Sequence, residues 1–445
     1  MPQVRTRVRR PAPVSDTLQQ LGERIRRARV DSGLSQAQLG APHFTRAYVS
    51  AVELGKVRPA MKSLEFMAGK LGKPVSFFME DEDTARRRLE RDAVAAHAKQ
   101  LVSEGKAAEA IELLLPQIAE TSISSQRARL QRLLGRAYTQ ARRGPEAVDV
   151  LTRALLTFES VDDPEQIART RAQLGAALIE VPSYGEAESA LERALEELSR
   201  AVVKDPLLRV HILYNLGVTF YMRGDYRAAA QQFQRAEREG ADIGDDRWQA
   251  GLLAGMGMSY LALADYEAAV MYFRRSEALF EGIRNKVRAV ESRFRLGQSL
   301  RAMGQNSKAI ELVRSALADA RGFRDKALAT RISAFHAVQL ADVGELDEAI
   351  REAAGAQAAA DSLNDPVLRV ESRVSVAKAL AKRDPKKAER VLRDAAALAE
   401  RTNVGYSFAD VYQELSDVLA HNGMAEEALS YSRKAFEVAR RGSGR

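Results

Sequence analysis

Residues 215–236 read NLGVTFYMRGDYRAAAQQFQRA, and residues 255–276 read GMGMSYLALADYEAAVMYFRRS. The second stretch matches the first position by position in a glycine, an aspartate-tyrosine pair, two alanines and a phenylalanine. A sequence that matches itself at a period of about 20–50 residues is typical of proteins built by stacking one supersecondary unit. The pattern therefore predicts a repeat protein.

The repeat extends from about residue 91 almost to the end of the chain. One alanine recurs in each of nine units, at intervals of 37 to 42 residues. These alanines are Ala110, Ala147, Ala187, Ala229, Ala269, Ala309, Ala349, Ala388 and Ala428. Twelve residues earlier a small residue is common, as at Gly135, Gly175, Gly217, Gly257 and Gly297. We expect these small residues where two helix backbones approach closely, with larger residues such as Phe233 between them.

Residues 215–236 also resemble the tetratricopeptide repeat (TPR), whose order of L-G, Y, G-x-Y, A, F and A they largely reproduce. The resemblance covers about residues 91–440 and implies an all-α protein with a right-handed α-solenoid of about nine helix pairs. The period lies nearer 40 than the usual 34 residues of this family, so the helices are expected to be about a turn longer. The tryptophan of the family pattern is missing.

A different pattern occupies residues 35–54, which read SQAQLGAPHFTRAYVSAVEL. Ser35 and Gln38 form an S-x-x-Q capping box, so a helix is expected to start at Ser35. This helix has to be short, because Pro42 lacks the N–H that a helix needs. Thr45 can cap a second helix. The pattern predicts two short helices joined by a tight turn, with the start of the second one exposed.

Residues 18–80 as a whole resemble the Cro/Xre family of helix-turn-helix repressors. The resemblance rests on Leu34-Ser35-Gln36, Leu39, Tyr48-Val49-Ser50, Val52-Glu53, Gly55-Lys56, Pro59 and Leu71-Gly72. It implies a five-helix domain whose second short helix enters the DNA major groove by its N-terminal end. Between Leu39 and Tyr48 the chain is one residue shorter than the usual family spacing, and Ala41-Pro42-His43-Phe44 replaces the leucine-glycine turn.

The same resemblance implies a set of DNA contacts. It assigns phosphates to Gln36 and Thr45, base edges to Arg46, Ala47, Ser50 and Ala51, and the backbone beyond to Lys56 and Arg58. Arg46 is the only residue of the base-facing set that can bond guanine O6 and N7 together. A plain phosphate contact by Arg46 is the open alternative. Tyr48, Val49, Val52 and Glu53 are expected to hold the domain together.

The charge of the chain supports a polyanionic partner for this region. The net charge is +8, and residues 1–80 carry 14 Lys+Arg against 6 Asp+Glu. Beyond residue 80 the charges cancel, with 68 − 14 = 54 basic and 60 − 6 = 54 acidic residues. A basic block joined to a neutral body is the electrostatic pattern of a nucleic-acid binder. The arginine-rich arm within residues 1–17 is predicted to be disordered, and either contacts DNA or serves as a solubilising tail.

TPR arrays bind peptides or proteins in the groove lined by the first helix of each unit. The resemblance implies a lining of Arg129, Arg132, Arg136, Arg169, Gln173, Tyr214, Asn215, Tyr221, Arg295, Gln298 and Arg301. Asparagine can bond the N–H and C=O of a peptide together, and arginine forks suit carboxylates. We expect an effector peptide with an acidic side chain or a free C-terminus. A solvated, arginine-rich face without a ligand is the alternative.

The pairing of the two segments resembles the peptide-pheromone-responsive transcription regulators. It predicts a dimeric, sequence-specific DNA-binding regulator whose solenoid senses a peptide or protein effector. Two alternatives remain: the repeats only dimerise, or the chain is a scaffold whose helix-turn-helix contacts protein. The predicted division is a basic arm (1–17), a DNA-binding domain (18–80), a charged linker (81–90), the solenoid (91–440) and a disordered tail (441–445).

Other classes of function are not expected. The chain has no cysteine, so it forms no disulfide and suits a reducing cytoplasm. Its five histidines lie far apart, and no P-loop or G-x-S-x-G motif occurs, which predicts no metal, no cofactor and no enzymatic activity. The longest apolar run, residues 250–264, is shorter than the roughly 18 residues of a membrane span. Its Gly251-x-x-x-Gly255 pair is expected to serve close packing of soluble helices.

Overall fold

The computed structural model describes residues 14–79, 82–201, 205–323, 325–402 and 407–442. These residues form α-helices joined by short turns, and no strand occurs among them, which confirms the all-α prediction. Contacts divide the chain into two compact units, Met1–Glu120 and Thr121–Arg445. Each unit is described by itself.

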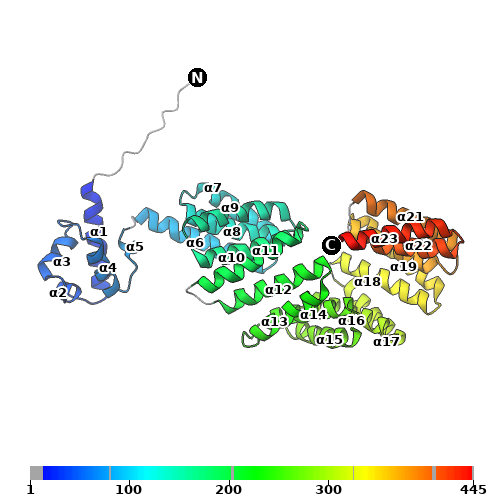
Figure 1. The fold of residues 1–445 in the computed structure, drawn as a ribbon. Helices are drawn as coiled ribbons and strands as arrows, with labels where there is room; N and C mark the ends of the chain where they lie inside the picture. Colours follow the sequence, from blue (N-terminus) through cyan, green and yellow to red (C-terminus); the bar gives the residue numbers. More distant parts are fainter. Residues whose placement is uncertain (1–13, 80–81, 202–204, 324, 403–406, 443–445) are drawn as a thin grey trace, which may run out of the picture. The chain divides into compact units, whose positions relative to one another are not determined.

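The first unit contains five helices followed by one helix pair (Figure 1). The helices are α1 (Val14–Asp31), α2 (Gln36–Gly40), α3 (Arg46–Glu53), α4 (Met61–Lys70), α5 (Val75–Met79), α6 (Glu82–Ser103) and α7 (Ala107–Glu120). Helices α1 to α5 enclose one small core, whose largest fully buried members include Phe78, Ile25 and Leu39. We call α1–α5 the N-terminal helical unit.

Two boundaries differ from those expected. Helix α1 begins at Val14, whereas the basic arm was expected to extend to residue 17. Helix α6 begins at Glu82, inside the stretch 81–90 predicted as a linker. The sequence there places Glu82 and Asp83 four residues before arginines, a spacing that stabilises helices. Residues 1–13 and 443–445, the larger parts of the predicted arm and tail, lie outside the described residues.

The second unit is a series of eight helix pairs, which together with α6–α7 make the nine pairs expected for the described solenoid. They are α8 (Ser124–Gln140), α9 (Gly144–Ser160), α10 (Pro164–Glu180), α11 (Tyr184–Arg200), α12 (Pro206–Arg223), α13 (Tyr226–Glu239), α14 (Asp246–Ala262), α15 (Tyr266–Gly282), α16 (Lys286–Ala302), α17 (Asn306–Arg321), α18 (Lys326–Asp342), α19 (Leu346–Leu363), α20 (Pro366–Leu380), α21 (Pro385–Thr402), α22 (Ser407–His421) and α23 (Ala425–Gly442). Most of them have 16–18 residues.

The repeated small residues lie at the centre of the helix pairs. The recurring alanines are all buried, from Ala110 to Ala428. The recurring glycines, however, do not bring two backbones together. A methyl group on Gly135 would lie 2.4 Å from the Leu151 side chain, and one on Gly217 would lie 2.5 Å from Phe233. In the five first helices that carry it, this glycine therefore makes room for a large side chain of the second helix. The expectation that it brings two backbones together is corrected in this respect.

Aspartates fix where the first helices begin. The side chains of Asp163, Asp205, Asp245, Asp325 and Asp365 each accept a hydrogen bond from a backbone N–H in the first turn of their helix. Such N-caps typically stabilise a helix by about 1 kcal/mol. Besides their partners along the chain, many first helices contact the next first helix, as α8 contacts α10 and α10 contacts α12. Within the second unit the first helices thus pack side by side from α8 to α16 and again from α18 to α22, and we call these helices the layer of first helices.

Candidate functional site

The two short helices of the N-terminal helical unit are set by their caps. Ser35 caps α2, and its hydroxyl accepts a hydrogen bond from the Gln38 N–H while the Gln38 side chain accepts one from the Ser35 N–H. Thr45 caps α3 by accepting from the Tyr48 N–H at 3.2 Å. Lys70 of α4 donates to carbonyls at the end of α2, including that of Gln38 at 2.7 Å. Both predicted helix starts are confirmed.

Helix α3 divides into a buried and an exposed face. Val49, Val52 and Glu53 are buried, whereas Arg46 and Ala47 at its start are exposed. The remaining residues predicted to contact DNA are exposed (Thr45, Lys56 and Arg58) or half-buried (Gln36, Ser50 and Ala51). This arrangement leaves a cationic, hydrogen-bonding helix end open to a ligand.

A buried carboxylate holds this helix in place. Arg29 of α1 donates to both oxygens of Glu53, at 2.6 and 3.0 Å, and Gln36 of α2 donates to Glu53 Oε2 at 2.8 Å. The hydrogen bond to Glu53 raises the pKa of Arg29. Glu53 therefore joins the first three helices. The expectation that it holds the domain together is consistent with these contacts, and the amide of Gln36 is engaged inside the protein.

We predict that Glu53→Ala destabilises the N-terminal helical unit by about 3 kcal/mol, because it leaves the half-buried Arg29 without its partner. Hydrogen exchange of the α3 amides in the full chain measures this loss. Glu23→Ala is the matched control, since Glu23 lies on the surface and pairs with the exposed Arg27 at 3.5 Å. It should cost at most about 1 kcal/mol. Unchanged exchange in the Glu53 variant would contradict the role given to this carboxylate.

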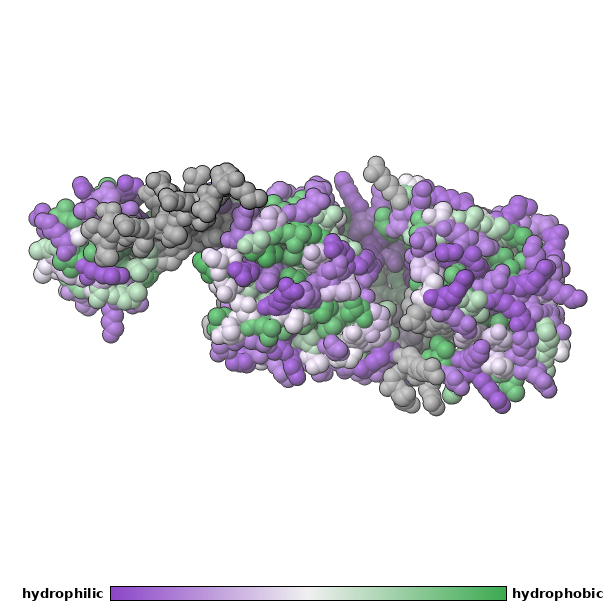
Figure 2. All heavy atoms as spheres, turned by 90° about the horizontal axis from the view of Figure 1, so that it is seen from above, coloured by the Kyte–Doolittle hydropathy of each residue, from purple (hydrophilic) through white to green (hydrophobic). Residues whose placement is uncertain are grey.

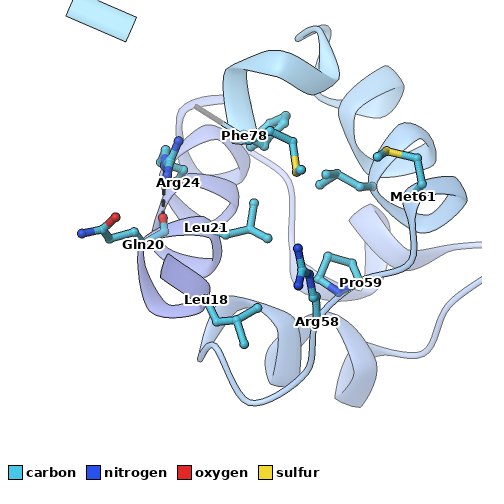
Figure 3. A pocket seen from close by; sticks show the side chains of 10 residues that line it. Leu18, Gln20, Leu21, Arg24, Arg58, Pro59, Met61 and Phe78 are labelled. Atoms are coloured by element: carbon cyan, nitrogen blue, oxygen red, sulfur yellow. Dashed lines mark hydrogen bonds between the residues drawn. The ribbon is translucent and has the colours of Figure 1, made fainter. Parts of the chain in front are cut away.

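Arg58 follows helix α3 in the chain and also borders a pocket of the N-terminal helical unit. With Pro59 it lines a pocket between α1, α4 and α5, together with Leu21 and Phe78 (Figure 3). Its side chain is exposed, so a contact with a DNA backbone stays a prediction. Apolar residues such as Met61 line the pocket together with the polar Gln20 and Arg24.

In the second unit, the predicted groove residues lie on the layer of first helices. Arg132 of α8 and Gln173 of α10 meet directly: with its amide oriented to satisfy both atoms, Gln173 donates to the Arg132 carbonyl at 2.9 Å and accepts from Arg132 Nη1 at 3.2 Å. Arg169 forms ion pairs with Glu165 at 3.0 Å and Asp205 at 2.8 Å. Burial and the neighbouring arginines lower the pKa of Arg132 to about 10.

Further along the layer, on α12, the lining is aromatic and uncharged at Tyr214, Asn215 and Tyr221. Tyr214 packs on Phe233 with ring centres 5.6 Å apart, and burial raises its pKa. Asn215 is half-buried, and its side chain has no hydrogen-bond partner among the described residues. Tyr221 packs against Tyr226 at 5.3 Å.

Two of the predicted lining residues in α16 contact one another, and the third forms an ion pair with the following repeat. Arg295 donates to Gln298 at 2.9 Å, and burial lowers the pKa of Arg295. Arg301 instead pairs with Asp342 at 2.6 Å and lies over the Phe335 ring. Arg301 therefore links neighbouring repeats, because Asp342 ends the first helix of the following unit.

Three further titratable residues of this layer were not predicted from the sequence. His211, Glu291 and Arg331 stand six residues before the recurring small position of their helices, as Arg129 and Arg169 do. Burial and the nearby charge of Arg136 lower the pKa of His211. Glu291 and Arg331 are charge neighbours of Arg295. Reading the residue six positions before the recurring small residue in every unit, as at Arg129 and Arg169, would have found them.

Helix α14 carries glycine at two positions of the repeat where other first helices carry polar or charged residues. Gly251 corresponds to His211 and Glu291, and Gly255 corresponds to Asn215 and Arg295. A methyl group on Gly255 would lie 2.8 Å from Phe233, so this glycine serves packing as expected. A methyl group on Gly251 would meet nothing within 4 Å, so the packing role predicted for Gly251 is wrong. Gly251 leaves open space on the layer of first helices.

The described part of the chain shows neither a membrane span nor a metal cluster. None of its helices has the length and apolar character needed to cross a membrane. Figure 2 shows hydrophilic residues spread over the visible face, with smaller hydrophobic areas between them. The same residues hold no group of three or more His, Asp or Glu side chains placed to bind a metal ion.

Comparison with known families identifies the repeats. Residues 173–245 and 248–321 match models of the tetratricopeptide repeat. The chain therefore contains tetratricopeptide repeats, in the units where the sequence pattern is clearest. No curated protein matches the chain.

Several solved structures share the fold. A Rap protein complexed with competence and sporulation factor is 12% identical, with 80% of this chain and 99% of that chain covered and a TM-score of 0.64. The Rap conjugation gene regulator of plasmid pLS20, in complex with the Phr* peptide, is 14% identical, with 79% and 96% covered and a TM-score of 0.53. PlcR of Bacillus thuringiensis, in complex with the peptide PapR7 and DNA, is 20% identical, with 60% and 96% covered and a TM-score of 0.49. At 12% and 14% identity, the likeness to the two Rap structures establishes the fold alone.

Proposed function

We propose that this protein is a dimeric, DNA-binding transcriptional regulator whose TPR solenoid senses a peptide or protein effector. The observation that carries the DNA-binding part is the exposed, cationic N-terminal end of α3, with Arg46 and Ala47 in its first turn. The N-terminal 80 residues also carry the whole excess positive charge of the chain. The proposal places the protein in the cytoplasm and assigns it no catalytic step.

The order and length of the first helices support this assignment. Two short helices with a capped turn, braced from α1 through Glu53, suit insertion of α3 into a major groove. In this arrangement Arg46 reads a base and Lys56 contacts phosphate. The scaffold alternative leaves the concentration of positive charge at this end unexplained.

Substitution of Arg46 tests the reading role. Arg46→Ala should cost about 1–3 kcal/mol at the preferred operator and relax the preference at one base pair. Lys56→Ala should weaken binding to all sequences alike, because a phosphate contact carries no sequence information. Selection of bound DNA from random sequence, with each variant, measures both effects. Uniform loss in both variants would make Arg46 a phosphate contact.

A dimer is part of the proposal, because one domain of this kind reads only a half-site. The last helix, α23, offers a surface for it. Leu429 and Phe436, two helical turns apart, are 54% and 68% exposed, so two large apolar side chains lie on one face of this helix. A second copy, running antiparallel, sets Leu429 of one chain against Phe436 of the other.

Phe436→Arg should therefore give a monomer at micromolar concentration and lower operator affinity. Because Phe436 is exposed, the variant should fold as wild type does, which circular dichroism checks. Met271→Arg on α15 is the control, because Met271 is also exposed but lies outside this surface. Multi-angle light scattering measures the mass. Wild-type protein that is monomeric with and without DNA would refute the dimer.

The sensing part rests on the layer of first helices. Asn215 with a free amide, Tyr214 beside it and open space at Gly251 suit an extended peptide. The pLS20 regulator, which has a similar fold, was solved with a peptide. A ligand acts as a switch only when it binds one arrangement of the dimer better than another. If no effector alters DNA binding, the alternative in which the repeats only dimerise takes the place of this part.

A further inference from the structure

Pro42 leaves one carbonyl of helix α2 without its usual helical donor. The carbonyl of Gln38 would accept from the N–H of residue 42 if the helix continued, and proline has no N–H. The carbonyl of Gly40 is satisfied, since it accepts from the N–H groups of His43 and Phe44 at 3.1 and 2.7 Å. The turn between α2 and α3 therefore needs a donor from elsewhere in the chain.

Lys70 of α4 supplies this donor. Its ammonium group donates to the carbonyl of Gln38 at 2.7 Å and also to the carbonyl of Ala41. A lysine suits this place, because basic side chains can hydrogen-bond the last carbonyls of a helix. The contact spans 32 and 29 residues of sequence, so it ties α4 to the end of α2 and to the turn that follows.

Four aromatic rings extend this contact to α3. The Lys70 ammonium lies 5.2 Å from the centre of the Phe66 ring. Phe66 packs edge-on against His43 and Phe44, with ring centres 4.9 and 5.5 Å apart. Phe44 in turn stacks on Tyr48 of α3 at 5.1 Å. We call these four rings and the ammonium group the turn brace, which connects α4 to the first turn of α3.

The turn brace and Glu53 hold opposite ends of α3. Glu53, the last residue of the helix, is bonded to Arg29 of α1. The turn brace acts at the first turn, where Arg46 lies. A bidentate contact with guanine needs two N–H donors in place together, so operator affinity depends on how firmly this end of α3 is held.

We propose that Lys70 is a positioning residue for DNA recognition, which holds the turn between α2 and α3 so that Arg46 meets a base edge. The inference rests on the proposed DNA-binding function. The Lys70 side chain is exposed, so water can bond the Gln38 carbonyl when the ammonium group is removed, and the fold persists. Removal of the ammonium group then costs the fixed geometry of the turn, with little change in the unfolding temperature.

Lys70→Met tests the proposal, because it keeps a long side chain and removes the ammonium group. Affinity for the operator obtained by selection should fall about tenfold, within the range for loss of one base contact. Affinity for random duplex DNA and the salt dependence of operator binding should stay as in wild type. Lys70→Arg should restore operator affinity, since a guanidinium can donate to both carbonyls. Lys73→Met is the matched control, because Lys73 lies over Phe77 of α5 at 5.4 Å.

A double-mutant cycle shows whether Lys70 acts through Arg46. Arg46→Ala should weaken operator binding much less in the Lys70→Met background than in wild type, because the arginine is already misplaced there. Additive losses from the two substitutions would overturn the proposal. An equal loss on operator and random DNA, with a salt slope smaller in magnitude by about one, would also overturn it, since that result marks a direct phosphate contact.

Hydrogen exchange in the full chain separates this inference from the proposed function. The amide of Phe44, bonded to the Gly40 carbonyl, should exchange faster in Lys70→Met than in wild type or Lys73→Met. If wild type binds no duplex DNA, the proposed function fails, whereas faster exchange in Lys70→Met alone still establishes the turn brace. Unchanged exchange together with unchanged operator affinity would overturn the inference.

Discussion

The affinity of the full chain for duplex DNA should fall about a thousandfold between 50 and 200 mM monovalent salt. The expectation follows from counterion release: neutralising about six phosphates gives a slope of roughly −5 in log K against log salt. Six contacts suit two copies of a unit whose first 80 residues carry 14 Lys+Arg against 6 Asp+Glu. Fluorescence anisotropy with labelled operator or genomic fragments measures the slope.

Variants that remove one positive charge test which residues contribute to the salt dependence. Lys56→Ala should reduce the magnitude of the slope by about one for each phosphate that the lysine neutralises in the wild type. Lys434→Ala on α23 should leave the slope unchanged, since Lys434 lies over Tyr412 and Tyr431 in the last repeat. A flat salt dependence, or absence of binding at low salt, would favour the scaffold alternative.

Filling the open space at Gly251 should abolish the response of DNA binding to the effector. Nothing lies within 4 Å of a methyl group placed there, so Gly251→Phe can fold while its ring obstructs the layer of first helices. A coupling free energy of about 1–3 kcal/mol, typical of allostery, corresponds to a roughly 5- to 150-fold change in operator affinity. This change should disappear in Gly251→Phe. Operator affinity, measured with and without fractionated peptides from a cell extract, records the effect.

Two variants separate obstruction from other effects. Gly251→Ala should keep the response and stabilise the repeat by up to about 1 kcal/mol, because glycine is a poor helix former. Asn215→Ala should abolish the response without obstruction, since it removes only the amide proposed to bond the peptide backbone. A normal response in both Gly251→Phe and Asn215→Ala would refute the groove as the sensing surface.

Local signals made the main parts of the fold predictable from the sequence. The Ser35 capping box, the Thr45 cap and the recurring alanines each depend on a few neighbouring residues or on a fixed period. The two family matches fall within units whose pattern is clearest. Helix α6 was not predicted over residues 82–90 because a run of charged residues fits a linker as well as a helix with charges spaced by four.

Long-range contacts account for most of what the sequence did not predict. The bond from Gln36 to Glu53 and the pair of Arg301 with Asp342 join residues 17 and 41 positions apart. No local pattern distinguishes these side chains from free ones. The open space at Gly251 is equally invisible in sequence, because Gly255, four residues later, packs tightly on Phe233.

The most direct test of the central claim is selection of bound DNA from random sequence by the full chain, with and without cell-extract peptides. The account predicts an approximately palindromic site, enriched by wild type, whose affinity changes roughly 5- to 150-fold when an effector fraction is present. Recovery of no preferred sequence in either condition would contradict it.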